Sequence, residues 1–418
     1  MNKSAYLCNV GKLIPTPKNS IKHTQYPIYV PMKKFLLLIL SFLPFLTMAS
    51  DWDGVTVASS YAGGEGTEEN PYLISSPEEL AKLAADLKAD NACTKGVYYQ
   101  LTADITFNDS VFTRIVPTTR KNEYADYPAD SSNFKRTPII GQYVKDGEST
   151  YFEGSFDGDG HTISGLYVWD QGITYAGLFS MCSGATIKNL RITDSYFLTN
   201  SQFGVLAGKV LDSQLLNCEV DSSYSEGGGS KGGLLAGTLE GNTTMQNCFA
   251  EGWVFGKNDM GGLVGRIGVK DSNNVVVNNC FSYVNLRVKR RNNGSLAYDV
   301  LPNAQVNNCY WIPLEEAKQA VWTGAELLGE NIRQLTAEEF ASAGLVNELN
   351  KVAAEIPGAY HWLMGEKHPV YDTTNMTSIQ TISSEQQAAE VQYYNLQGQK
   401  VGADYRGLII CNGRKCLR

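Results

Sequence analysis

Few residue clusters in this sequence could do chemistry. His361 and His368 are near each other in the sequence. A zinc protease needs two histidines one helical turn apart with a glutamate between them, and the spacing of this pair does not fit that pattern. Asp157-Gly-Asp-Gly-His161 places two carboxylates beside an imidazole, which could bind Ca²⁺ or exchange protons. A Ca²⁺ loop needs several more oxygen ligands, so two tight turns explain this phrase more simply. We therefore expect no metal and no cofactor.

Acid pairs are the second kind of chemistry to consider. Enzymes that cleave glycosidic bonds place two carboxyl groups about 5 to 10 Å apart. Four acids of the repeat described below are expected to face outward: Glu219, Asp221, Glu251 and Asp259. They do not occupy the same position in successive repeats, so they do not form an obvious acid pair. The basic run Arg287–Arg291 is typical of a solvated loop. We expect a protein that is not an enzyme; the alternative is a glycan-active β-helix enzyme with acids from residues 108–150.

A repeat positions these residues. Asn-Cys pairs end at Cys218, Cys248, Cys280 and Cys309, at separations of 30, 32 and 29 residues. A second phrase alternates with them, as in Gly233-Leu-Leu-Ala-Gly237. Two phrases in alternation at a period near 30 indicate a solenoid. Forty glycines and 23 tyrosines, with few long apolar periodic runs, favour an all-β solenoid.

Six rows align on these pairs, and each column has a structural explanation. Apolar columns are expected to fill the lumen, and the cysteines to form a buried thiol ladder, because their spacing suits neither zinc nor disulfides. The third column is Gly165 followed by asparagines, which suit a bend with positive φ and can bond through stacked amides. The rows are Ile163–Val168, Ile187–Ile192, Leu215–Val220, Met245–Ala250, Val277–Ser282 and Val306–Trp311.

The fifth column supplies the predicted ligand-binding residues, Phe249, Phe281 and Tyr310. If the fourth and sixth columns face inward, alternation turns these rings outward. An exposed aromatic strip can stack on sugar rings and often marks an interaction surface. In the alternative, the bend breaks the alternation and the rings pack beneath a loop or inside the lumen.

The start of the chain resembles an export signal. Met32-Lys-Lys precedes an apolar run over 35–46 and small residues up to Ser50. We expect residues 32–50 to be a signal peptide and residues 1–31 to be a mis-called upstream extension; a signal anchor is the alternative. The apolar run is too short for a comfortable membrane span. The mature chain is therefore expected to be secreted or at the outer cell surface, without a stable membrane span.

The remaining segments divide the chain into five predicted parts after residue 50. A helix capped by Ser76 should run to about Lys88 within an N-terminal cap and first irregular coils, 51–150. The repeats occupy 151–311, and a C-terminal cap, 312–372, should include helical residues 314–321 and a helix after Thr336 that closes the solenoid. Residues 373–390 read as a linker. Residues 391–418 form a β tail with a hairpin at Asn412-Gly413.

These phrases resemble the GLUG-motif repeats of bacterial surface and secreted proteins. The phrases Gly233–Gly237 and Gly262–Gly265 match best, while residues 66–83, 156–166 and 335–342 are similar to the entry, first coil and closing segment. The resemblance implies a right-handed parallel β-helix, often in adhesin-like or host-glycan-facing proteins. Such repeats also occur beside IgA-protease-type metallopeptidase domains, but the repeat itself has no assigned chemistry.

The C-terminal tail, 394–410, is similar to tails of proteins sent out by type IX-like secretion. It departs from them where Cys411 and Cys416 replace the usual apolar residues.

Charge and composition complete the prediction. The net charge is −8 and no basic face is evident, which argues against a nucleic-acid partner. We expect a monomeric, non-catalytic, adhesin-like β-helix protein that is secreted or at the cell surface. Its expected partner is a host or microbial glycan or an extracellular protein.

Overall fold

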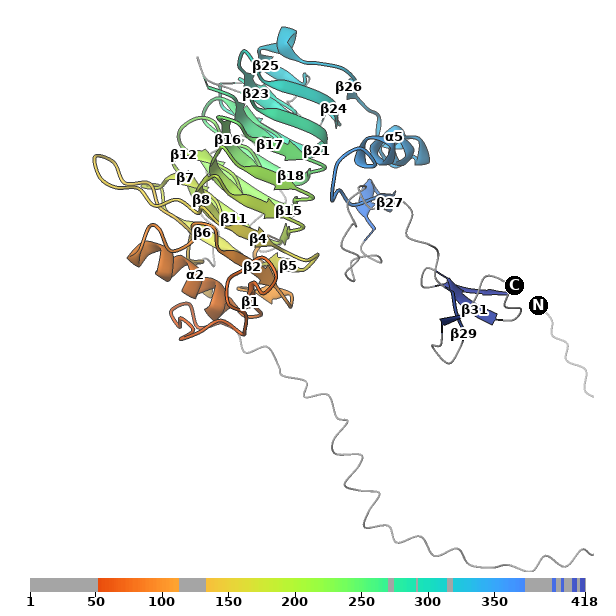
Figure 1. The fold of residues 1–418 in the computed structure, drawn as a ribbon. Helices are drawn as coiled ribbons and strands as arrows, with labels where there is room; N and C mark the ends of the chain where they lie inside the picture. Colours follow the sequence, from red (N-terminus) through yellow and green to blue (C-terminus); the bar gives the residue numbers. More distant parts are fainter. Residues whose placement is uncertain are drawn as a thin grey trace, which may run out of the picture. The chain divides into compact units, whose positions relative to one another are not determined.

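The chain folds into a solenoid of stacked parallel strands (Figure 1). The computed structural model describes residues 52–112, 133–269, 274–290, 292–313 and 319–372, together with the backbone of four short strands within 393–417. Strand β9 (Thr186–Lys188), for example, pairs in parallel with β4 (Ser155–Asp157) in the coil before and with β14 (Gln214–Leu216) in the coil after. The predicted parallel β-helix is confirmed, with about seven coils. The predicted signal peptide lies outside the described residues.

Two sheets run along the solenoid. The larger sheet has 16 strands, and its outer face forms one side of the site described below. Its remaining strands are β1 (Tyr72–Ile74), β2 (Tyr98–Leu101), β3 (Ile105–Thr106), β5 (Thr162–Ser164), β6 (Tyr167–Trp169), β10 (Arg191–Thr193), β11 (Tyr196–Thr199), β15 (Glu219–Gly227), β17 (Thr244–Gln246), β18 (Phe249–Gly256), β21 (Val276–Val288), β24 (Gln305–Trp311) and β26 (Ile332–Gln334).

The second sheet has six strands and lies on another side of each coil. Two strand pairs, β7 (Thr174–Ala176) with β12 (Ser201–Phe203) and β19 (Met260–Gly261) with β22 (Asn293–Gly294), complete the coils. The six strands are β8 (Phe179–Ser183), β13 (Ala207–Leu211), β16 (Ala236–Glu240), β20 (Val264–Ile267), β23 (Ala297–Val300) and β25 (Val321–Thr323).

The cysteine column lies in the lumen, as predicted. The four repeat cysteines are fully buried and free, and each thiol donates to the carbonyl oxygen two residues before it, as Cys248 does to Gln246 at 3.1 Å. Burial disfavours the thiolate and raises the pKa of Cys248, Cys280 and Cys309 well above the usual value. These thiols therefore act as small apolar core groups with a satisfied donor.

The asparagine column forms a side-chain ladder at a left-handed bend. Asn189, Asn217, Asn247 and Asn279 have φ between 52° and 57°. From Asn217 onward, each of these amide nitrogens donates to the amide oxygen of the preceding asparagine, at 2.7 Å from Asn217 to Asn189, 2.8 Å from Asn247 to Asn217 and 2.7 Å from Asn279 to Asn247. The predicted bend and the predicted stacked amides are both confirmed. At Asn308 the ladder shifts, because its amide donates to Asn278.

The first row of the sequence alignment is wrong. Ile187 pairs with Phe156, whereas Ile163 pairs with Ile192. Gly165 (φ 71°) therefore belongs to a second bend, where it corresponds to Asp194 (φ 50°) and not to Asn189. Both bends need positive φ, so a glycine alone does not distinguish them.

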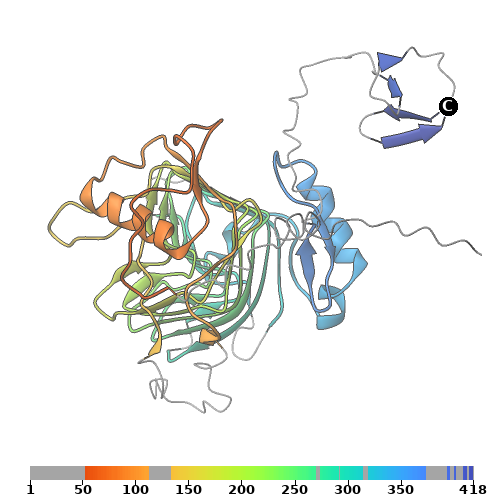
Figure 2. The same cartoon turned by 90° about the horizontal axis from the view of Figure 1, so that it is seen from below.

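An N-terminal helix, α2 (Pro77–Ala89), covers the first coil (Figure 2). The Ser76 hydroxyl caps it by accepting from the Glu79 amide, as predicted. The Glu79 carboxylate accepts from the Ser75 amide instead of that of the cap residue. Leu80, Leu83 and Leu87 are fully buried in the lumen cluster, so this apolar face of the helix packs on the first coil.

The C-terminal cap differs from the prediction in its place. Helices α4 (Ala337–Phe340) and α5 (Ala343–Ala353) and the hairpin of β27 (Trp362–Met364) and β28 (Pro369–Tyr371) pack on the outer face of β18, β21 and β24, not across the open end. A helix does begin after Thr336, which forms a capping box with Glu339. Residues 314–318 lie outside the described part, and the predicted helix end at Val321 is instead strand β25, followed by a 3-10 turn (Ala325–Leu327).

The tail forms a small antiparallel sheet of β29 (Tyr393–Asn395), β30 (Lys400–Val401), β31 (Leu408–Cys411) and β32 (Arg414–Leu417). Cys411 pairs with Arg414 in the antiparallel pair of β31 and β32, while the predicted hairpin turn at Asn412 and Gly413 lies outside the described residues. None of the described helices is long and apolar enough to cross a membrane.

The buried thiol ladder makes a direct prediction. In native protein, iodoacetamide should alkylate the partly exposed Cys93 slowly, because burial raises the pKa of its thiol to about 11, while Cys218, Cys248, Cys280 and Cys309 stay unmodified until denaturant is added. Peptide mass spectrometry at each cysteine measures the rates. Native-state labelling of the four ladder cysteines at the rate of Cys93 would contradict the ladder.

Candidate functional site

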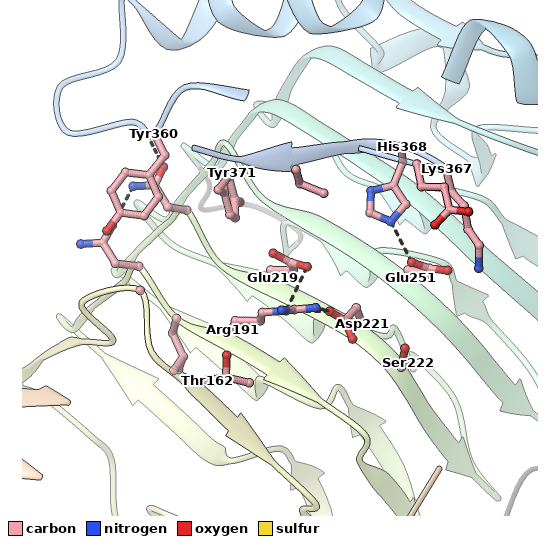
Figure 3. A pocket seen from close by; sticks show the side chains of 16 residues that line it. Thr162, Arg191, Glu219, Asp221, Ser222, Glu251, Tyr360, Lys367, His368 and Tyr371 are labelled. Atoms are coloured by element: carbon pink, nitrogen blue, oxygen red, sulfur yellow. Dashed lines mark hydrogen bonds and ion pairs between the residues drawn. The ribbon is translucent and has the colours of Figure 1, made fainter. Parts of the chain in front are cut away.

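A groove of about 560 Å³ lies between the outer face of the large sheet and the C-terminal segment 358–371 (Figure 3). Strands β10, β15 and β18 form its floor with Arg191, Glu219, Asp221 and Glu251. The hairpin carrying His368 forms its wall. The groove therefore brings together charged residues from several coils and from the cap.

Arg191 is the centre of an ion network on the floor. Its Nε lies 2.7 Å from Oδ2 of Asp221 and 3.3 Å from Oε1 of Glu219. The contact with Glu219 follows from strand register, because the two residues are directly paired on neighbouring strands. The Thr193 hydroxyl also donates to Asp221. The arginine side chain remains 48% exposed, whereas those of Glu219 and Asp221 are 10% and 6% exposed.

A β-bulge shapes the floor at this point. The pairing of β15 with β18 shifts between Val220 and Ser223, so two residues, Asp221 and Ser222, face Glu251 alone. Ser222 takes a left-handed φ of 42°, which is uncommon for serine. Bulges of this kind often redirect side chains beside functional sites. Here the bulge lies where the acids of two coils line one groove.

Glu219 has a strongly altered acidity. Burial raises its pKa to about 8, and the neighbouring Asp221 carboxylate adds to the rise, while Arg191 opposes it. Glu219 therefore keeps its proton to a higher pH than an exposed glutamate does.

His368 holds the other side of the groove. Its Nε2 lies 2.9 Å from Oε2 of Glu251, its Nδ1 lies 2.7 Å from the Pro369 carbonyl oxygen, and its ring packs 4.4 Å from that of Phe249. Burial lowers the pKa of His368, but the hydrogen bonds to Glu251 and Pro369 outweigh it, so the net shift is upward. The imidazolium form thus ties the hairpin to the sheet.

The predicted binding residues Phe249, Phe281 and Tyr310 share one column on the outer face, in the expected register. The expectation that they are exposed is wrong, because they are at most 1% exposed. Phe340 and Trp362 of the cap pack on Phe281, and Arg333 lies over Tyr310. Their ring faces are therefore closed to a sugar in this structure, as in the alternative in which they pack beneath another segment.

The Asp157–His161 phrase is structural. Asp157 accepts from the Asn189 amide and pairs with Lys188, and His161 contacts Asp104 at 3.3 Å. Across the residues that the structure describes, no three His, Cys, Asp or Glu side chains are grouped to hold a metal ion.

Sequence reasoning missed the groove because its residues occupy different columns and elements. Glu219, Asp221 and Glu251 look scattered along the chain, and His368 lies more than 100 residues further on. One signal in the sequence could have indicated that the cap packs here. Residues 340–349 have an apolar face that must be buried against another element, and in the structure it packs on the aromatic column.

No protein-family model matches the chain. Halomucin of Haloquadratum walsbyi is 33% identical over 215 residues, which are 51% of this chain and 2% of halomucin. A "Putative Gly-rich membrane protein" of Evansella cellulosilytica is 26% identical over 165 residues, which are 37% of this chain and 16% of that protein. The chain thus spans a small fraction of the length of both relatives.

Two solved structures are similar to the chain. A "putative immunoglobulin A1 protease" from Bacteroides ovatus has a TM-score of 0.43 at 18% identity, over 76% of this chain and 98% of that one. A second structure, described as IgA1 protease, has a TM-score of 0.37 at 17% identity, over 63% of this chain and 17% of that one.

The His368 contact predicts weaker packing of the cap at alkaline pH. Because its folded-state pKa lies above 6.5, the charged pair with Glu251 stabilises the fold below that value and is lost as pH rises through the folded pKa. The raised pKa of Glu219 acts in the same direction up to about pH 8. Urea unfolding followed by tryptophan fluorescence should therefore show a lower midpoint at about pH 9 than at about pH 6.

The variant H368Q should reduce this pH dependence. The control H161Q, which removes an imidazole beside a largely exposed aspartate, should keep it. Equal pH slopes in wild type and H368Q would rule out the proposed role of the pair.

Proposed function

We propose that this chain is a secreted or cell-surface, adhesin-like β-helix protein that binds a glycan or an extracellular protein in the groove, without catalysis. The proposal rests on the polar groove and on the ion pairs that fix its side chains. Arg191 contacts Glu219 and Asp221, and His368 contacts Glu251. The export signal predicted at Met32 supports an extracellular location.

The chemistry of the groove favours a polar ligand. The cap covers the aromatic column of Phe249, Phe281 and Tyr310, so a sugar ring cannot stack on those side chains. Arg191 is half-exposed and already oriented by its contacts with Glu219 and Asp221, so it can donate to ligand oxygens at little cost in side-chain entropy. Sugar hydroxyls and peptide carbonyls are suitable acceptors.

One observation favours a second candidate, a glycan-active enzyme. Burial raises the pKa of Glu219, and its neighbour Asp221 contacts the same guanidinium nitrogen, Nε of Arg191. Glycoside-cleaving enzymes use a carboxyl group of raised pKa as the general acid, together with a second carboxyl group nearby. In this candidate Glu219 would protonate the leaving oxygen. The acids would then come from the sheet and not from residues 108–150.

The binding proposal predicts that R191M loses its ligand. On an array of glycans and extracellular-matrix proteins, the variant should bind at least about tenfold more weakly than wild type, because a charge-assisted hydrogen bond is lost. The control is R266M, which removes a comparable buried pair with Asp299 at 3.2 Å on the second sheet, away from the groove. Circular dichroism confirms folding. Equal binding by R191M and wild type would exclude the groove.

The enzyme candidate makes a different prediction. Wild-type protein incubated with a panel of polysaccharides should release reducing ends, and E219Q should abolish the release, because the amide cannot donate the acid proton. Absence of release by folded wild-type protein supports the non-catalytic proposal. Release that persists in E219Q would place any activity elsewhere.

A further inference from the structure

The asparagine ladder does more than join coils, because its outer side holds the C-terminal segment through peptide groups. Asn217 donates from Nδ2 to the Gly358 carbonyl oxygen at 2.8 Å. Its Oδ1 accepts from the Tyr360 amide at 2.9 Å. One asparagine thus binds both the acceptor and the donor of a neighbouring backbone, in addition to its ladder bonds.

The next two asparagines repeat this use. Asn247 donates to the Tyr360 carbonyl oxygen at 3.0 Å and accepts from the Trp362 indole at 2.7 Å. Asn279 donates to the Leu349 carbonyl oxygen at 3.1 Å. In each case one amide hydrogen goes to the preceding asparagine and the other to a backbone carbonyl of the cap.

Asn189 is the ladder asparagine that the cap does not reach. Its Nδ2 donates to Oδ1 of Asp157 at 2.9 Å, and its Oδ1 accepts from Asn217. Within the described residues it has no further partner, so one N–H and one acceptor position stay open. Asn189 is half-buried and lines the groove next to Gly160, Thr162 and Tyr360.

The chain's own segment turns away before this point. It joins the ladder at Gly358, whose φ of 77° gives the sharp turn out of the region that follows α5. Asn189 therefore lines the groove without a side-chain hydrogen bond to the cap.

We propose that Asn189 binds the backbone of an extended polypeptide, a segment of a partner protein that enters the groove and continues the line of residues 358–362. The inference rests on the proposed binding function and names its ligand class. A peptide is favoured over a glycan because backbone carbonyls occupy the three equivalent asparagines in this structure. Arg191 and the acids of the floor then face the side chains of the ligand.

A pair of glycine variants tests the proposal. N189G deletes the open amide while glycine keeps the left-handed bend at φ 56°. The matched control, N308G, deletes an asparagine of the same column with φ 49° that does not line the groove. The probes are an array of short synthetic peptides and, separately, tri-N-acetylchitotriose, whose acetamido groups also offer an amide.

We expect peptides that bind wild type to bind N189G about tenfold more weakly, for two lost neutral hydrogen bonds, and to bind N308G unchanged. The side-chain amide resonance of Asn189 should also shift when a binding peptide is added. Equal peptide binding by N189G, equal loss in N308G, or binding of the oligosaccharide alone would each overturn the proposal. Binding that is sensitive to R191M but not to N189G would leave the proposed function standing without this inference.

Discussion

The amide ladder is the interaction on which the rest of this structure depends. Each asparagine adopts a left-handed φ that turns the chain, and the side chains of Asn217, Asn247 and Asn279 each bond to the asparagine of the coil before. The bend and the bond require the same residue, because asparagine tolerates positive φ and carries both a donor and an acceptor. Strand register, the stacked thiols and the lumen all follow from coils held in this alignment.

The cap relies on the same ladder from outside. Asparagine amides satisfy its backbone groups, and buried rings supply the apolar contact, each worth about 1.5 to 3 kcal/mol on burial. Phe281 illustrates the result, since Phe340 and Trp362 lie within about 5 Å of it. The aromatic column is therefore part of a second core, built on the outer face of the sheet.

Features that recur in every repeat could be predicted from the sequence. Contacts between elements far apart in the chain could not. Cys218 to Cys309 and Asn189 to Asn279 were assignable because a column shows its role in every row. Gly165 was misplaced because two bends accept glycine. Phe249 looked exposed because alternation says which way a side chain points, but not which distant segment covers it. The contact of Glu251 with His368 joins residues too far apart in the chain for any local pattern to show.

The attachment of the cap to three successive asparagines limits how this solenoid can change in length. Repeat proteins commonly gain and lose coils by duplication and deletion, since each coil contacts only its neighbours. Here a coil added between Asn217 and Asn279 would separate partners that one short segment must reach together. Coils in that stretch are therefore fixed in number, whereas coils before Asn189 are free of this constraint.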